Sequence, residues 1–184
     1  MFLSKGMLIK KHSKSSVIIQ NYGGRYALKG KEARIWLRAR DKFLIPRQEE
    51  LGLILKLLEF GLMLQADKPN EYGKYYVLAN NCVYVNPRKK RLFRLRGIEK
   101  DVMLWLQGGA RRLRIEELVY LIDNHINPLD YINDKYGVAL SERIYRSRIQ
   151  VTNTLRREMA YAKSRENVVN SVLRLFGKNR LYLC

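Results

Sequence analysis

Arginines alternate with polar side chains in one stretch near the end of the chain, and side chains of these types can contact nucleic acid. The stretch runs from Ser141 to Lys163 and reads SERIYRSRIQVTNTLRREMAYAK. Arginine forms paired hydrogen bonds with guanine and with phosphates, whereas Asn and Gln pair with adenine. The side chains expected to make such contacts are Arg143, Arg146, Arg148, Gln150, Asn153, Arg156 and Arg157.

The same stretch has the apolar spacing of an amphipathic helix. Its apolar line consists of Ile144, Val151, Leu155 and Met159. This spacing predicts a helix that starts near Ser141, which is a suitable N-cap residue. The apolar face of this helix is expected to pack against a core. Polar Gln150 and Thr152 leave open which face points inward. A surface helix whose arginines are only solvated is the alternative.

The charge of the whole chain favours a polyanionic partner. Its 184 residues include 36 Lys and Arg against 17 Asp and Glu, which gives a net charge of +19. An excess of this size attracts nucleic acid first, although ribosomal, RNA-binding and membrane-surface proteins share it. The apolar content of 47% is sufficient for a packed core.

A second set of cations lies outside this helix and is suited to phosphate contacts, which fix register without reading sequence. The tract from residue 88 to 91 is followed by Arg94 and Arg96. The alternative to phosphate contact is that the charges of this tract are only solvated. The second set consists of Arg88, Lys89, Lys90, Arg111, Arg112, Lys178 and Arg180.

Other chemistry finds little support in the sequence. Cys82 and Cys184 have neither metal-ligand spacing nor a disulfide framework, and His12 and His125 have no catalytic partners in sequence. No apolar run reaches the roughly 18 residues of a membrane span, and the lysine-broken start does not fit a signal peptide. We therefore expect a cytoplasmic protein that is not an enzyme, has no cofactor or metal, and does not enter a membrane.

The elements expected before this helix fall into two similar series. The first series has a strand at 7–9, a hairpin within 16–30, helices at 31–42 and 47–64, and a strand at 75–78. The second has a strand at 82–85, helices at 98–106 and 114–124, one helical turn after Pro128, the basic helix, and a closing hairpin within 168–183. Trp36 and Trp105 are expected in the core.

The two series also align with each other at a shift of 67 residues. The motif Leu-Lys-Gly-x-Glu at 28–32 falls on Leu-Arg-Gly-x-Glu at 95–99, and Glu-Glu-Leu at 49–51 falls on Glu-Glu-Leu at 116–118. Two matches in one register favour a duplicated unit of strands followed by helices.

The second series resembles the OmpR-type winged-helix DNA-binding domain of bacterial response regulators. The matching pieces are 111–118 (RRLRIEEL), 155–159 (LRREM) and the expected closing hairpin. The first series resembles a PqqD-type peptide-recognition domain, itself a winged helix, through Gly-Gly-x-Tyr-x-Leu at 23–28 and Ala-x-Ile-Trp at 33–36. In the OmpR-type family, a basic helix enters the major groove and the hairpin contacts the minor groove or backbone.

These resemblances imply an α+β, mainly helical fold of tandem winged helix-turn-helix domains with small antiparallel sheets. The expected domains are 1–80 and 81–184. The function expected is a sequence-specific regulator of transcription that binds double-stranded DNA, either as a homodimer or with another regulatory protein. A plasmid or phage replication initiator is one alternative. A peptide-binding or assembly module is the other.

Overall fold

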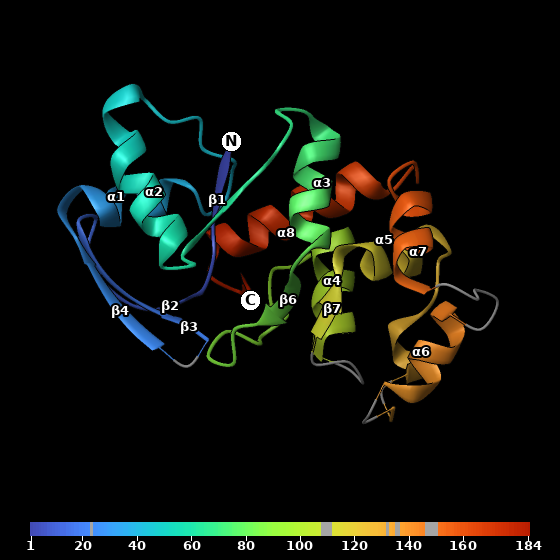
Figure 1. Ribbon diagram of the computed structural model, residues 1–184. Helices are drawn as coiled ribbons and strands as arrows, with labels where there is room; N and C mark the ends of the chain where they lie inside the picture. Colours follow the sequence, from blue (N-terminus) through green and yellow to red (C-terminus); the bar gives the residue numbers. More distant parts are fainter. Residues whose placement is uncertain (23, 108–111, 132, 135–136, 146–150) are drawn as a thin grey trace.

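The computed structural model describes residues 1–22, 24–107, 112–131, 133–134, 137–145 and 151–184, without the side chains of residues 151–153. These ranges form an α+β fold with small antiparallel sheets (Figure 1). No helix in them is long and apolar enough to cross a membrane.

The N-terminal half is a three-stranded meander followed by two helices. Its elements are β1 (Phe2–Ser4), β2 (Met7–Ser13), β3 (Ser16–Asn21), β4 (Gly24–Lys29), α1 (Gly30–Arg38), a 3-10 turn (Gln48–Glu50), α2 (Leu51–Glu59) and β5 (Met63–Gln65). Strands β2, β3 and β4 pair in sequence order, and β1 pairs with β5. The predicted hairpin and both predicted helices are confirmed here, but with shorter bounds. The first helix ends before Lys42, and the second ends at Glu59, so that Met63 and Leu64 belong to β5.

The C-terminal half surrounds a second three-stranded sheet with helices. Its elements are α3 (Glu71–Ala79), β6 (Cys82–Val85), α4 (Gly97–Gln107), β7 (Arg112–Arg114), α5 (Ile115–Asp123), a 3-10 turn (Pro128–Tyr131), α6 (Val138–Tyr145), α7 (Val151–Met159), α8 (Arg165–Gly177) and β8 (Leu181–Leu183). Strand β6 lies between β7 and β8 and is antiparallel to both. The helical turn predicted after Pro128 is confirmed.

The strand predicted at 75–78 is wrong, because this segment is the interior of α3. The Asn70 side chain caps the helix by accepting a hydrogen bond from the backbone N–H of Gly73 at 2.9 Å. Tyr75 and Leu78 lie on its buried side. The β-branched and aromatic residues of this segment favoured a strand. The N-cap and the burial of one face stabilise a helix instead.

The closing hairpin predicted within 168–183 is also wrong. Its first part is α8, where Val168, Val172 and Leu175 recur at helical spacing and are all buried. A tight turn with Asn179 at φ 55° then leads into β8, which pairs with β6 rather than with a partner hairpin strand. The basic wing expected at this end is therefore replaced by a helix and a single strand.

The basic stretch from Ser141 to Lys163 contributes to two helices. Ser141 is not an N-cap, because α6 begins at Val138 and the Asp134 carboxylate accepts hydrogen bonds from the N–H groups of Val138 and Leu140, each at 2.9 Å. Helix α7 ends at Met159, before the predicted end.

The positions aligned at a shift of 67 share local geometry. Gly30 and Gly97 both have positive φ, 57° and 51°, and both begin helices. The backbone N–H of Arg47 donates to Glu50, and in the same way the N–H of Arg114 donates to Glu117. The two series diverge afterwards, because β5 and α3 follow the first whereas α6, α7 and α8 follow the second.

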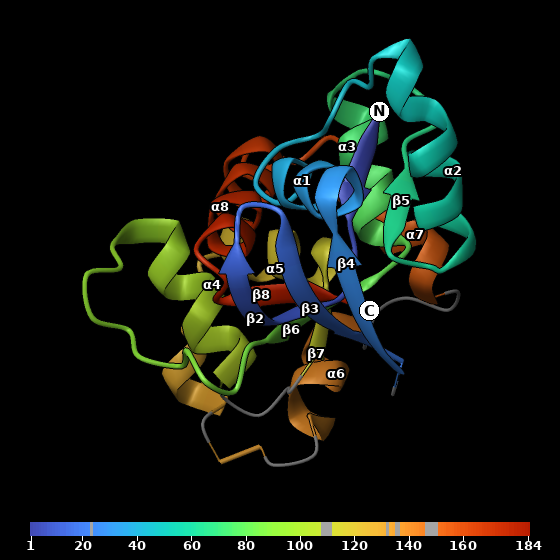
Figure 2. The ribbon, with the colours of Figure 1, turned by 90° about the vertical axis from the view of Figure 1, so that its left-hand side faces the viewer.

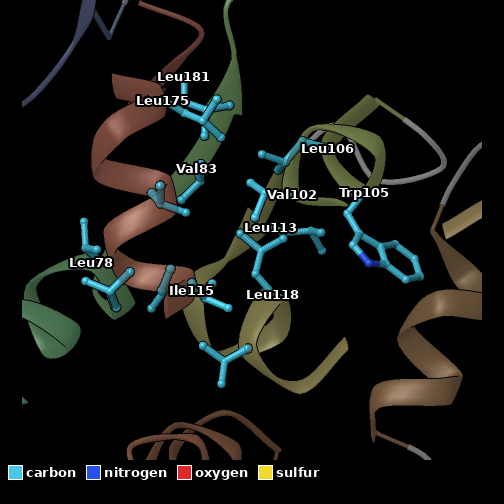
Figure 3. Close-up of a cluster of buried hydrophobic side chains, with 14 of the residues drawn as sticks. Leu78, Val83, Val102, Trp105, Leu106, Leu113, Ile115, Leu118, Leu175 and Leu181 are labelled. Carbon is cyan, nitrogen blue, oxygen red and sulfur yellow. The ribbon is translucent and has the colours of Figure 1, made fainter. Parts of the chain in front are cut away.

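Two clusters of buried apolar side chains form the core. One lies between the meander and helices α1 and α2 and includes Trp36. The other lies between the β6 sheet and helices α4, α5 and α8, where Val83, Val102 and Leu118 point toward one another (Figure 3). Both tryptophans are buried, as predicted. Because α3 packs with the second cluster, it is part of the C-terminal core; the boundary at 80/81 stays a prediction.

Two helical glycines provide a test of this packing. A Cβ atom at Gly73 would lie 2.0 Å from the carbonyl oxygen of Lys68, whereas a Cβ at Gly52 would meet nothing within 4 Å. We expect Gly73→Ala to lower the free energy of unfolding by about 1–3 kcal/mol, because the chain before α3 must move. Gly52→Ala is the matched control and should raise it by about 0.5–1 kcal/mol. Urea unfolding measures both, and an unchanged midpoint for Gly73→Ala would contradict this packing.

Candidate nucleic-acid interface

The densest group of cations lies in the loop between β6 and α4. Six of the 11 residues from 86 to 96 are basic, and all six are exposed. They are Arg88, Lys89, Lys90, Arg91, Arg94 and Arg96. We call this segment the basic loop. Among the described residues, no carboxylate lies within ion-pair distance of these six side chains, so their charge is directed to solvent.

Polar contacts hold the basic loop at several points. At its start, the Asn86 amide donates to the carbonyl oxygen of Asn179 at 2.9 Å. Further along, Gln107 Nε2 donates to the Lys90 carbonyl at 2.6 Å. The Arg180 guanidinium donates to the carbonyl oxygens of Arg91 and Phe93. None of these bonds uses a cationic side chain of the loop, so they leave its charges available to an external anion.

Strand β2 adds a second line of cations beside the basic loop. The Arg88 guanidinium donates to the carbonyl oxygen of Ile9 at 3.3 Å, which joins segments 79 residues apart in sequence. Lys10 and Lys11 follow Ile9 and are exposed. Figure 2 shows the loop as the green segment that projects beside β2. The fold thus joins two basic segments into one surface, which we call the loop–β2 surface.

The basic stretch from Ser141 to Lys163 is placed only in part. Arg143 on α6 and Arg157 on α7 are exposed. Arg146, Arg148 and Gln150 lie outside the described residues, as does the side chain of Asn153. The described part therefore leaves two of the predicted base- or phosphate-contacting residues, Arg143 and Arg157, in a position to meet a ligand.

Arg156 is turned toward the protein instead. Its Nε lies 3.5 Å from Oε1 of Glu116, a carboxylate with no exposed surface, and Nη1 donates to Asn80 at 2.8 Å. The Tyr75 hydroxyl donates to the Arg156 carbonyl at 2.9 Å. Burial raises the pKa of Glu116, and the nearby Arg156 opposes this shift. Arg156 therefore joins α7 to α3 and α5, and we leave it out of the proposed contact surface.

The remaining predicted phosphate contacts are divided between surface and structure. Arg112 is exposed on β7, where a hydrogen bond to Tyr84 raises the pKa of the guanidinium. Lys178 bonds to Glu99 at 2.6 Å, and Glu99 also accepts from Arg174 at 2.8 Å. Arg180 holds the basic loop, and Arg111 lies outside the described residues.

Sequence reasoning missed two parts of this surface. It did not join Lys10 and Lys11 to the basic loop, because only the fold brings β2 against Arg88. It also gave no role to Phe93, whose side chain is exposed. The one sequence signal for the latter is an aromatic residue inside a run of cations. Among the described residues, no group of His, Cys, Asp or Glu side chains could hold a metal ion.

The two adjacent arginines of α7 allow a matched stability test. We expect Arg156→Met to lower the free energy of unfolding at pH 7 by about 3 kcal/mol, because the buried Glu116 carboxyl group then loses the cation that favours its ionised form. Arg157→Met should change it by less than about 0.5 kcal/mol, because Arg157 is exposed. Urea unfolding of both variants at pH 7 measures the difference.

The pH dependence identifies the cause. Losing Arg156 raises the folded-state pKa of Glu116 further, so the destabilisation is present above that pKa and shrinks as the pH falls toward about 4.3, the ordinary value for Glu. Arg156→Met combined with Glu116→Leu should recover most of the loss at pH 7. An equal deficit at pH 5 and pH 7 would show that the arginine acts only through packing.

Comparison with protein-family models, with curated proteins and with solved structures gave no match to this chain. The likeness to OmpR-type and PqqD-type winged helices therefore stays a prediction. We infer function from the loop–β2 surface and the contacts that hold it.

Proposed function

We propose that the protein binds double-stranded DNA through the loop–β2 surface. The observation that carries this proposal is the hydrogen bond from Arg88 to Ile9, which places the basic loop beside the lysines of β2. Regularly spaced phosphates are the ligand that best matches many exposed cations without neutralising carboxylates. Because the loop is already held through its backbone, binding costs little further backbone entropy.

The exposed arginines of α6 and α7 supply a second part of the proposed interface. Arg143 and Arg157 are of the residue type that reads guanine or binds phosphate. Phosphate contacts from the basic loop would position the protein on DNA, and these arginines would add base contacts. A role in regulating transcription, or in starting replication of a plasmid or phage, belongs to the same proposal.

Peptide binding is a second candidate. Strand β4 pairs with β3 on one side, and no other strand in the described part of the chain pairs with it. An extended peptide can add to such an edge as a further strand. This function does not require the basic loop, so the two proposals differ in what charge removal does.

A charge-removal variant tests the DNA proposal. We expect Lys89→Gln, Lys90→Gln and Arg96→Gln together to weaken binding to a random duplex. The slope of log affinity against log salt concentration should become shallower by about one for each phosphate that the variant no longer neutralises. These three side chains are exposed, so the fold should be retained. Fluorescence anisotropy at several salt concentrations measures both effects.

The matched control removes three other cations, Lys31, Arg34 and Arg47, which lie on α1 and before α2 near Glu49. It has the same net charge as the loop variant and should keep a nearly unchanged slope. Equal losses in both variants would mean that net charge alone drives binding. No retention of duplex by the unaltered protein at low salt would overturn the proposal and favour the peptide function.

A further inference from the structure

Phe93 is an exposed aromatic side chain at the outer part of the basic loop. It is 74% exposed, although the leucines on either side, Leu92 and Leu95, turn toward the core. The Leu95 N–H donates to the Leu92 carbonyl at 3.0 Å, and Arg94 within this turn has a positive φ of 66°. The turn thus fixes two leucines inward and directs the aromatic ring between them to solvent.

The ring is held in this position by bonds to the backbone around it. Arg180 donates to the carbonyl oxygens of Arg91 and Phe93 itself, and Gln107 donates to Lys90. An apolar group displayed on a fixed loop loses less entropy on binding than one on a free tail. The loop therefore presents Phe93 as a preorganised contact.

The side chains around Phe93 indicate the kind of partner that it would contact. The Arg94 guanidinium lies 5.3 Å from the centre of the ring, and the other exposed side chains of the basic loop are mostly cations. A partner must therefore offer anionic groups with an apolar, stackable surface between them, which is the chemistry of a base step flanked by phosphates. A membrane surface fits less well, because Phe93 is the one large apolar side chain that the loop exposes.

We propose that Phe93 acts as a wedge that enters a base step of double-stranded DNA while the neighbouring arginines bind the flanking phosphates. This inference rests on the proposed DNA-binding function and adds how the duplex is deformed. Insertion of an apolar side chain unstacks one step and bends the duplex. The protein should therefore favour steps that unstack easily, such as TA steps, mismatches and single-nucleotide gaps.

The test compares Phe93→Ala and Phe93→Leu with a control, Ile45→Ala. Ile45 is 74% exposed, as Phe93 is, and lies between α1 and α2, near the cations removed in the charge control. Anisotropy gives the affinity for a paired duplex and for the same duplex with one central mismatch. Energy transfer between dyes at the two duplex ends reports bending.

We expect Phe93→Ala to weaken binding to the mismatched duplex roughly five- to 150-fold, the range found when an aromatic side chain that stacks on a base is replaced by alanine. It should also abolish bending and leave the salt slope unchanged, because no charge is removed. Phe93→Leu should keep most of the bending, since leucine also serves as a wedge. Ile45→Ala should behave like the unaltered protein.

Other outcomes distinguish the wedge role of Phe93 from the DNA-binding function on which it rests. DNA binding without bending, and with equal affinity for Phe93→Ala, would overturn the wedge and leave the DNA-binding function in place. No duplex binding by the unaltered protein would overturn both. Phe93-dependent sedimentation with anionic phospholipid vesicles, without duplex bending, would assign the side chain to a membrane surface and also overturn the wedge.

Discussion

The turn that follows α8 joins the two halves of the protein and the basic loop. The Arg40 guanidinium, which is almost fully buried, donates to the carbonyl of Phe176 at 2.8 Å and to the Asn179 side chain at 3.0 Å. Asn179 in turn donates to the carbonyl of Leu8 on β2 and accepts from Asn86 at the start of the loop. Burial lowers the pKa of Arg40 to about 10, so it keeps its charge at neutral pH, held by these acceptors. The position of the loop beside β2 depends on this turn.

The distribution of carboxylates explains why the loop keeps its charge. Three of the described glutamates form partly buried pairs away from it: Glu50 with Arg38 at 2.5 Å, Glu32 with Lys56 at 2.6 Å, and Glu99 with Arg174 and Lys178. Each of these pairs joins two elements of the fold. With 17 acids for 36 bases, more than half of the cations have no carboxylate available to them. In the basic loop, backbone hydrogen bonds rather than acidic side chains hold the segment that carries such cations.

Local pattern predicted much of the fold, and tertiary packing decided the rest. The hairpin within 16–30 and the helices around Leu55 and Leu118 have clear periodicity and turn signals, and the structure has them. The segment at 75–78 and the end of the chain were misread, because their apolar residues fit a strand as well as a helix until the buried face is known. For the site, composition alone pointed to residues 88–91. The partnership with β2 and the outward turn of Phe93 depend on contacts 79 and 87 residues apart along the chain, which no local pattern contains.

Arg156 and Arg157 show the limit of reading charge from sequence. They are adjacent and identical in type, yet one pairs with buried Glu116 and the other is exposed. One step along a helix rotates the side chain by about 100°, enough to move it from the core stripe to the solvent face. A run of arginines in a sequence therefore includes both residues that are free to bind a partner and residues that stabilise the fold. In this protein Arg156, Arg174 and Arg180 belong to the second kind, and the proposed interface consists of cations that they leave free.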